Sequence, residues 1–304
     1  MAKKVIPINQ SSLFEDMRPD TVALSSYLVE RLVETRPYGE PGLLLGTSAF
    51  TANEWVGSFY PNGLSPQDYL GYYAAQFQTV EIDSTFYGCP SAAIVNKWHL
   101  KTPLDFIISA KVPQVINHEK MLVDCEAKFE EFVDRMNILG EKLGPMLLQF
   151  PKFNKFVMNE NEFLRRLRFF LERVKGLPTA RFVVEIRNKP WLTERLLDVL
   201  RENRVALALS DTSFMPRPWE QKLDLITTDF AYVRWLGDRK GIERETTTWD
   251  KTIVDRGDDL RNWVDLFKTI RRKTPDLKIY AYANNHYQGH GPGTVKLLWD
   301  LYKG

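Results

Sequence analysis

Charged and amide side chains recur where short apolar segments of this sequence end. In Thr79–Asp83 apolar residues alternate with two acids, so Glu81 and Asp83 share one face of an extended segment. Six segments of this kind carry a polar residue near their end, on the side opposite the apolar residues: Glu81, Lys111, Gln149, Glu185 with Arg187, Arg234 and Asn284. Acids and bases mixed in this way predict a site that neutralises a negative charge and transfers protons.

The residue types assign a role to each member of this set. Glu81 or Glu185 is expected to transfer the proton, since a carboxylate among apolar walls and charges can titrate near neutral pH. Lys111, counted with these two as catalytic, is expected to neutralise an anionic substrate together with Arg187 and Arg234. The other candidate substrate-binding residues at the strand ends are Asp83, Gln149, Asp211, Asn284 and His286. The alternative is an ion network that only fills this end of the fold, because unpaired buried charges are costly.

A glycine-rich turn follows the last strand-like segment. Pro292 suits the first turn of a helix that runs to Tyr302. The backbone amides at the start of that helix, with His290, Gly291 and Gly293 beside them, are expected to bind a phosphate or another anion. The alternative is that the turn only leads the chain into the helix.

A metal site would require Glu81, Glu185, Asp211 and a histidine to converge. The positive charges of Lys111, Arg187 and Arg234 in the same place would repel a cation. We therefore expect no cofactor, and a divalent metal is the less favoured alternative.

The elements that position these residues alternate in type along the chain. Strand-like runs occur at Leu43–Gly46, Thr79–Asp83, Phe106–Lys111, Met146–Phe150, Arg181–Arg187, Val205–Asp211, Ala231–Leu236 and Lys278–Asn284. Helical patterns separate most of them, for example at Asp124–Leu143, Glu160–Lys175, Thr193–Asn203 and Asp258–Lys273. Eight strands alternating with helices predict a TIM-type (β/α)8 barrel, which places active sites where its strands end. An open doubly wound sheet is the rival, but no glycine-rich dinucleotide fingerprint follows an early strand.

Three segments depart from this repeat. Residues 1–41 are expected to be an N-terminal helical extension, with Asp20 capping its helix, outside a barrel domain of residues 42–304. The extension either packs on the barrel or binds a partner. Residues 212–229 predict an irregular sixth helix, and residues 237–257 predict a long polar loop.

The overall composition limits the classes of partner. Lys and Arg total 41 against 39 Asp and Glu, so a net charge of +2 gives no global basic field for nucleic acid. No apolar stretch is long enough to span a membrane, and no signal peptide is visible. With only two cysteines, a cytoplasmic location is expected. A nucleic-acid enzyme or binder that uses the loop at Arg239–Arg256, and a non-catalytic ligand-binding or scaffolding barrel, are the alternatives to a small-molecule enzyme.

Several short motifs occur in a fixed order along the chain: Gly46-Thr47-Ser48, Trp55–Pro61, Thr79–Tyr87, Trp98 with Thr102-Pro103, Phe106–Lys111, Gln149-Phe150-Pro151, Glu185-Ile186-Arg187, Tyr232-Val233-Arg234, and Asn284-Asn285-His286 with Gly289-His290. Together these motifs resemble the YecE-like family, also called domain of unknown function 72. The resemblance covers roughly residues 43–303 and implies a TIM-type barrel without implying a reaction. Asp83 stands where such sequences more often have Asn.

Overall fold

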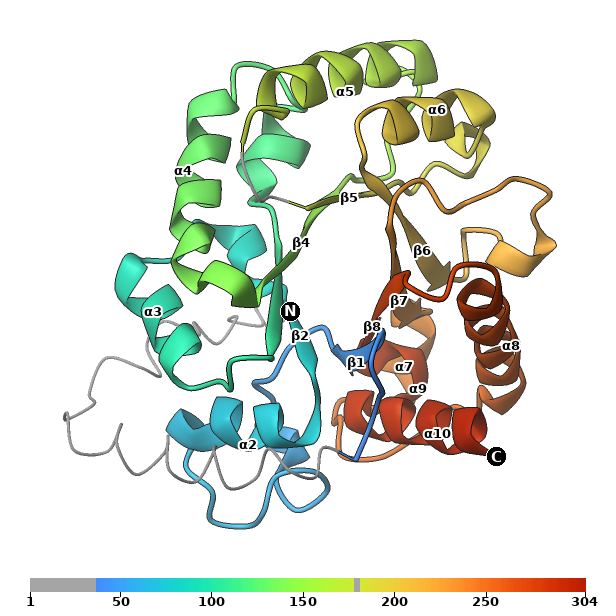
Figure 1. The fold of residues 1–304 in the computed structure, drawn as a ribbon. Helices are drawn as coiled ribbons and strands as arrows, with labels where there is room; N and C mark the ends of the chain where they lie inside the picture. The colour runs from blue at the N-terminus through green and yellow to red at the C-terminus, as the bar shows by residue number, and fades with distance from the viewer. Residues whose placement is uncertain (1–36, 178–180) are drawn as a thin grey trace, which may run out of the picture.

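Eight parallel strands form a nearly closed barrel in the computed structural model, which describes residues 37–177 and 181–304 (Figure 1). The strands are β1 (Leu43–Thr47), β2 (Thr79–Ile82), β3 (Ile107–Lys111), β4 (Leu143–Gln149), β5 (Phe182–Glu185), β6 (Ala206–Thr212), β7 (Phe230–Gly237) and β8 (Lys278–Ala283). Hydrogen-bonded neighbours follow the order β1-β8-β7-β6-β5-β4-β3-β2. The predicted TIM-type barrel is therefore confirmed.

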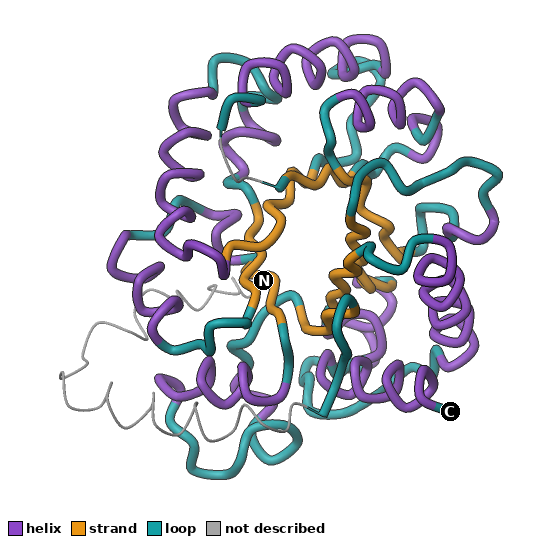
Figure 2. Tube along the Cα trace, viewed as in Figure 1, coloured by secondary structure: helices purple, strands orange, loops and turns teal. Residues whose placement is uncertain are grey.

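Helices surround the ring of strands (Figure 2). They are α2 (Tyr69–Gln76), α3 (Ala92–Leu100), α4 (Glu126–Met136), α5 (Glu160–Val174), α6 (Glu194–Glu202), α7 (Arg239–Glu245), α8 (Gly257–Lys273), α9 (Asn285–Gln288) and α10 (Gly291–Lys303). Between β6 and β7 the described chain forms only a 3-10 turn at Pro218–Glu220, which agrees with the predicted irregular sixth helix. The predicted loop at residues 237–257 contains α7, which buries Ile242. The helix predicted near Asp20 lies outside the described residues.

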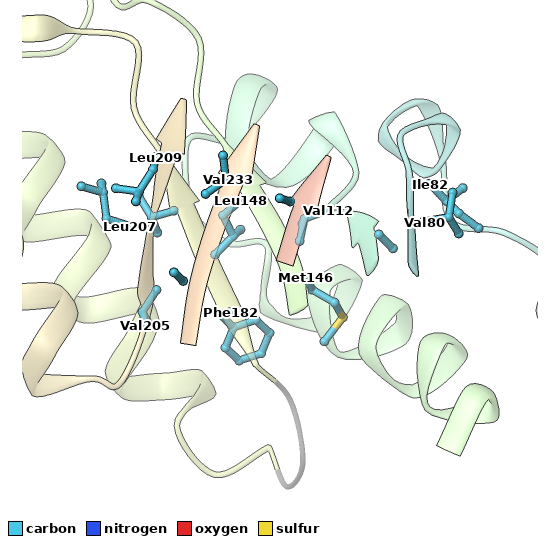
Figure 3. Close-up of a cluster of buried hydrophobic side chains, with 14 of the residues drawn as sticks. Val80, Ile82, Val112, Met146, Leu148, Phe182, Val205, Leu207, Leu209 and Val233 are labelled. Atoms are coloured by element: carbon cyan, nitrogen blue, oxygen red, sulfur yellow. The ribbon is translucent and has the colours of Figure 1, made fainter. Parts of the chain in front are cut away.

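Residues on the two faces of the strands point as the alternation predicts, with one set toward the helices and the other into the barrel. On the outer face, apolar side chains such as Val80, Ile82, Met146 and Leu148 pack in one large core beneath the helices (Figure 3). A smaller cluster fills the barrel interior with Leu147, Val183, Ala206, Ala208, Phe230, Tyr232, Tyr280 and Tyr282. The polar strand-end residues lie above this inner cluster, because they continue the same inward face of each strand.

The barrel closes between β1 and β2 through a side chain. The Tyr73 hydroxyl accepts a hydrogen bond from the Thr47 amide at 2.7 Å and lies 3.2 Å from the Thr79 carbonyl oxygen, to which it can donate. Gly46 allows this close approach, because a Cβ atom there would lie 1.9 Å from the same oxygen. Tyr73 therefore bridges the strands at the point where backbone pairing ends.

Candidate active site at the carboxyl ends of the strands

Arg234 holds two buried carboxylates at the top of the barrel interior. Its Nη2 and Nε atoms donate to Glu81 Oε1 at 2.7 and 3.2 Å, and its Nη1 donates to Glu185 Oε2 at 2.5 Å. The Tyr232 hydroxyl donates to the other oxygen of Glu81 at 2.6 Å. These groups come from β2, β5 and β7, so the strands bring together residues that are far apart in the sequence.

Charge pairing dominates this network. Burial alone would raise the pKa of Glu185, but Arg234 and Arg187 outweigh it and hold that pKa below its usual value. Burial alone would lower the pKa of Arg234, but the charges of Glu81 and Glu185 outweigh burial and raise that pKa above its ordinary value. Glu185 is therefore a fixed anion, and Glu81 already accepts three hydrogen bonds. Neither has the free carboxyl group that the predicted proton-transfer role requires.

Lys111 has a different environment at the end of β3. Its Nζ lies 4.1 Å from the centroid of the Phe86 ring, and it forms no salt bridge or hydrogen bond within the described residues. Burial, and then the charge of Arg234, lower its pKa to about 8. Lys111 is thus a cation that loses its proton more readily than an exposed lysine does.

Asp83 and His118 titrate beside Lys111. Burial raises the pKa of Asp83 to about 6, although the charge of Lys111 opposes that rise. Burial and the charges of Lys111 and Arg187 lower the pKa of His118 to about 4. The His118 ring packs edge-on against Phe86, with 4.9 Å between the centroids. Two groups near Lys111 therefore have pKa values moved away from their ordinary ranges.

Arg187 and Gln149 also lie at this end of the barrel. The Arg187 Nε atom is 3.3 Å from Glu185 Oε1, and 32% of its side chain is exposed. Its terminal nitrogens make no hydrogen bond within the part of the chain that the structure describes. Gln149 is buried and pairs in register with Glu185 on the neighbouring strand. The structure thus groups Glu81, Lys111, Gln149, Glu185, Arg187 and Arg234 as predicted, with Asp83 at the rim.

Asp211 does not join this group. Its carboxylate accepts hydrogen bonds from Trp263 Nε1 at 2.7 Å and from the Tyr287 hydroxyl at 3.0 Å, and it pairs with Arg217. These partners lie on the helical side of β6, whose inward positions are taken by Ala206 and Ala208. The prediction that Asp211 faces substrate is corrected, because the opposite face of β6 is the inner one.

Asn284 caps the short helix α9 beyond β8, and His286 lies within that helix. Asn284 Oδ1 accepts a hydrogen bond from the His286 amide at 3.0 Å and lies 2.5 Å from His286 Nδ1. The other ring nitrogen of His286 lies 3.3 Å from Glu243 on α7, and Trp249 packs against the ring. Asn284 is therefore engaged in capping α9, and the His286 ring is engaged by Asn284, Glu243 and Trp249.

The turn that leads into α10 satisfies its own amides. The Gly291 amide donates to Asn285 Oδ1 at 2.8 Å, and the Gly293 amide donates to His290 Nδ1 at 3.1 Å. Because Nδ1 accepts this bond, the proton of a neutral His290 lies on Nε2, which is 3.3 Å from Ser58 Oγ. The phosphate predicted at this turn would therefore meet amides that are already hydrogen-bonded.

The sequence did not identify Tyr232, Phe86 or His118 as members of the site. Tyr232 lies two residues before Arg234, so strand alternation alone places it on the same inner face. Phe86 and His118 lie in short helical turns after β2 and β3, at Ser84–Tyr87 and Val115–Glu119. No periodicity points to these residues, because their position depends on how the turns fold back.

Residues 37–177 and 181–304 lack two kinds of feature. No group of three or more His, Cys, Asp or Glu side chains in these ranges is arranged to hold a metal ion. No helix in them has the length and apolar composition that crossing a membrane requires.

Comparisons with known proteins show the family to which this chain belongs. Residues 44–304 match the family described as protein of unknown function DUF72. The chain is 35% identical over 79 residues to the UPF0759 protein YecE of Escherichia coli K12, covering 26% of this chain and 29% of that protein. It is 28% identical over 143 residues to the UPF0759 protein YunF of Bacillus subtilis 168, covering 45% of this chain and 48% of YunF. The matched regions thus span less than half of either relative.

One solved structure is similar over most of the barrel. A DUF72 family protein from Thermotoga maritima superposes with a TM-score of 0.65 at 25% sequence identity, covering 85% of this chain and 97% of that one. A second DUF72 family structure, from Enterococcus faecalis, gives a TM-score of 0.60 at 18% identity, covering 86% of this chain and 96% of that one, which supports the fold alone.

Proposed function

Because the chain belongs to the DUF72 family of proteins of unknown function, we propose its activity from the chemistry of the barrel mouth. We infer that it is an enzyme acting on a small polar, anionic molecule of phosphorylated or sugar-like character. Lys111 and Asp83 transfer protons, and Arg187 binds the negative charge of the substrate. Glu81, Glu185 and Arg234 form the fixed base of the site.

The observation that carries this proposal is the state of Lys111. A half-buried ammonium with no salt bridge or hydrogen bond within the described chain, whose pKa is lowered by burial and by the charge of Arg234, is unfavourable unless a ligand or a reaction uses it. Asp83, with a pKa of about 6, and Lys111, with a pKa of about 8, bracket neutral pH. Such a pair can donate and accept protons under physiological conditions.

Arg187 supplies the means of binding an anion. Its guanidinium is partly exposed, and among the described residues its one ion pair is with Glu185 at 3.3 Å. Arginine presents several donors in one plane, which suits a phosphate or carboxylate. Arg234 is unsuited to this role because Glu81 and Glu185 already engage it.

The proposal is tested by incubating the protein with a defined mixture of sugar phosphates and small keto and hydroxy acids, followed by mass spectrometry. Wild type and Arg168→Met, a change at an exposed residue of α5, are expected to consume the same compound. Lys111→Met is expected to slow this loss by about 100-fold or more, which is the usual contribution of a general acid–base group. No consumption by wild type, or equal rates in Lys111→Met, would overturn the proposal.

A further inference from the structure

The Nζ atom of Lys111 lies among groups that favour attack by a neutral amine. It projects from the last residue of β3, whose partner in register on β4 is the apolar Leu147. The Phe86 ring lies 4.1 Å away, and the side chain forms no ion pair within the described part of the chain. A lysine amine becomes a good nucleophile when apolar surroundings and a nearby cation disfavour its ammonium form. Burial and Arg234 supply these two conditions, and together they outweigh the carboxylates of Asp83, Glu81 and Glu185, which favour the ammonium form.

Another buried lysine, Lys142, has the hydrogen-bond acceptors that Lys111 lacks. Lys142 is more deeply buried, but its Nζ donates to the carbonyl oxygens of His99 and Thr102 at 2.5 and 2.6 Å. A third acceptor, Thr102 Oγ1, lies 3.4 Å from the same nitrogen, so each proton of the ammonium has a partner and no lone pair is free to attack a ligand. Burial alone therefore does not distinguish Lys111; its lack of hydrogen-bond acceptors and its place at the barrel mouth do.

We propose that Lys111 forms an imine with the carbonyl carbon of an anionic aldehyde or ketone whose charged group binds Arg187. This inference rests on the proposed function, and it narrows the substrate class from polar anions to those that carry a reactive carbonyl group. It also changes the role of Lys111 from proton transfer alone to covalent bond formation.

The proton balance of the step uses Asp83. Transfer of one proton from the Lys111 ammonium to the Asp83 carboxylate gives a neutral amine and a neutral acid without changing the net charge of the site. The amine nitrogen attacks the carbonyl carbon, the carbonyl oxygen takes the proton of Asp83, and the nitrogen returns a proton to Asp83. Asp83 then protonates the hydroxyl group, which leaves as water. The products are one protonated imine on Lys111 and one molecule of water.

The experiment traps this imine by reduction. The protein is incubated with pyruvate or glyceraldehyde 3-phosphate and sodium cyanoborohydride at pH 7.5, and the modified lysines are located by peptide mass spectrometry. At this pH an amine of pKa about 8 is roughly a quarter neutral, whereas an ordinary lysine is about 0.1% neutral. Lys111 is expected to carry at least about tenfold more label than the exposed Lys155, and Lys142 is expected to remain unlabelled.

Matched compounds and variants complete the design. Lactate and glycerol 3-phosphate keep the anionic groups but lack the carbonyl, so they are expected to compete with labelling and to leave no adduct. Lys111→Arg is expected to lose the label, and Lys111→Met provides a second variant if the first is poorly folded. Label on Lys111 no greater than on Lys155 with both carbonyl compounds would overturn the imine. If glycerol 3-phosphate still binds through Arg187 in that case, the proposed anion site stands without it.

Discussion

Arg234 on β7 and Glu81 on β2 form a buried ion pair, although their strands are not neighbours in the barrel. The Arg234 Nη2 atom lies 2.7 Å from Glu81 Oε1, and both side chains are almost fully buried. The same guanidinium reaches Glu185 on β5. One side chain thus connects three strands across the barrel interior and compensates two negative charges.

Removing this cation should destabilise the fold. In Arg234→Met, two buried carboxylates lose their shared partner, and breaking a buried ion pair costs about 3–5 kcal/mol. We expect the free energy of unfolding in urea to fall by about this amount. Arg165→Met is the control, because Arg165 is exposed and its partly exposed partner Glu162 also pairs with Arg166, so little change is expected. If Arg234→Met lost no more free energy of unfolding than Arg165→Met, the buried ion pairs of Arg234 would not stabilise the fold.

The hydroxyl of Tyr73 should be required where the barrel closes. Tyr73→Phe keeps the ring but leaves the buried Thr47 amide without its acceptor, which costs about 1–3 kcal/mol. The expected result is lower stability in urea and faster hydrogen exchange at the Thr47 amide. Tyr69→Phe on the same helix is the control, because the Tyr69 hydroxyl has no hydrogen bond within the described residues. Unchanged exchange at Thr47 would argue against the bridge.

Strand alternation predicted the barrel and most of the site from the sequence. It requires only that apolar residues face the helices, which fixes Glu81, Lys111, Glu185 and Arg234 on the inner face. It failed at Asp211, because both faces of β6 are apolar, with Ala206 and Ala208 on the inner face and leucines on the outer face. The local sequence contains no contrast that would fix the phase of this strand.

The roles of the residues were harder to predict than their positions. The sequence favoured Glu81 and Glu185 for proton transfer, but a three-dimensional contact to Arg234 engages both. The turn at His290 resembles an anion site until Asn285 and the His290 ring itself are seen to accept its amide protons. Which acceptor each donor binds depends on the folded structure, so no single sequence motif predicts it.

His290 should make the protein less stable in mild acid. Burial lowers its pKa to about 4, below the value of about 6.5 in an unfolded chain. The unfolded state therefore binds a proton first, so stability is intact above pH 6.5 and is lost as the pH falls toward 4. His290→Asn keeps a side-chain acceptor at the start of α10 and cannot titrate.

The comparison is made by urea unfolding at pH 7 and pH 5. We expect wild type to lose about 1–2 kcal/mol more than His290→Asn over this interval. Other titrating groups, such as His118, are present in both proteins and cancel in the difference. Equal losses in the two proteins would show that His290 does not titrate in this way.

Arg187 should determine the affinity for anions. Arg187→Gln removes the charge but keeps a polar side chain, and a hydrogen bond to a charged group contributes about 1.5–3 kcal/mol. Binding of glycerol 3-phosphate, measured by calorimetry, is expected to weaken by about tenfold or more. Arg168→Gln on the exposed surface of α5 should bind as wild type does. Equal affinity in Arg187→Gln and wild type would remove Arg187 from the site.

The charge of Asp83 should control the pH at which Lys111 becomes reactive. Asp83 favours the ammonium form of Lys111, and its anion is present above its own pKa of about 6. Asp83→Asn removes this charge with almost no change in shape, so the pKa of Lys111 should fall below its value of about 8. The measurement is the rate of acetylation of Lys111 between pH 5 and 10, followed by peptide mass spectrometry with Lys155 as an internal standard. Asp134→Asn, at an exposed position of α4, should leave the midpoint unchanged. A midpoint in Asp83→Asn that stays or moves upward would mean that Asp83 does not act on Lys111, and the proton path proposed for the imine would need another acid.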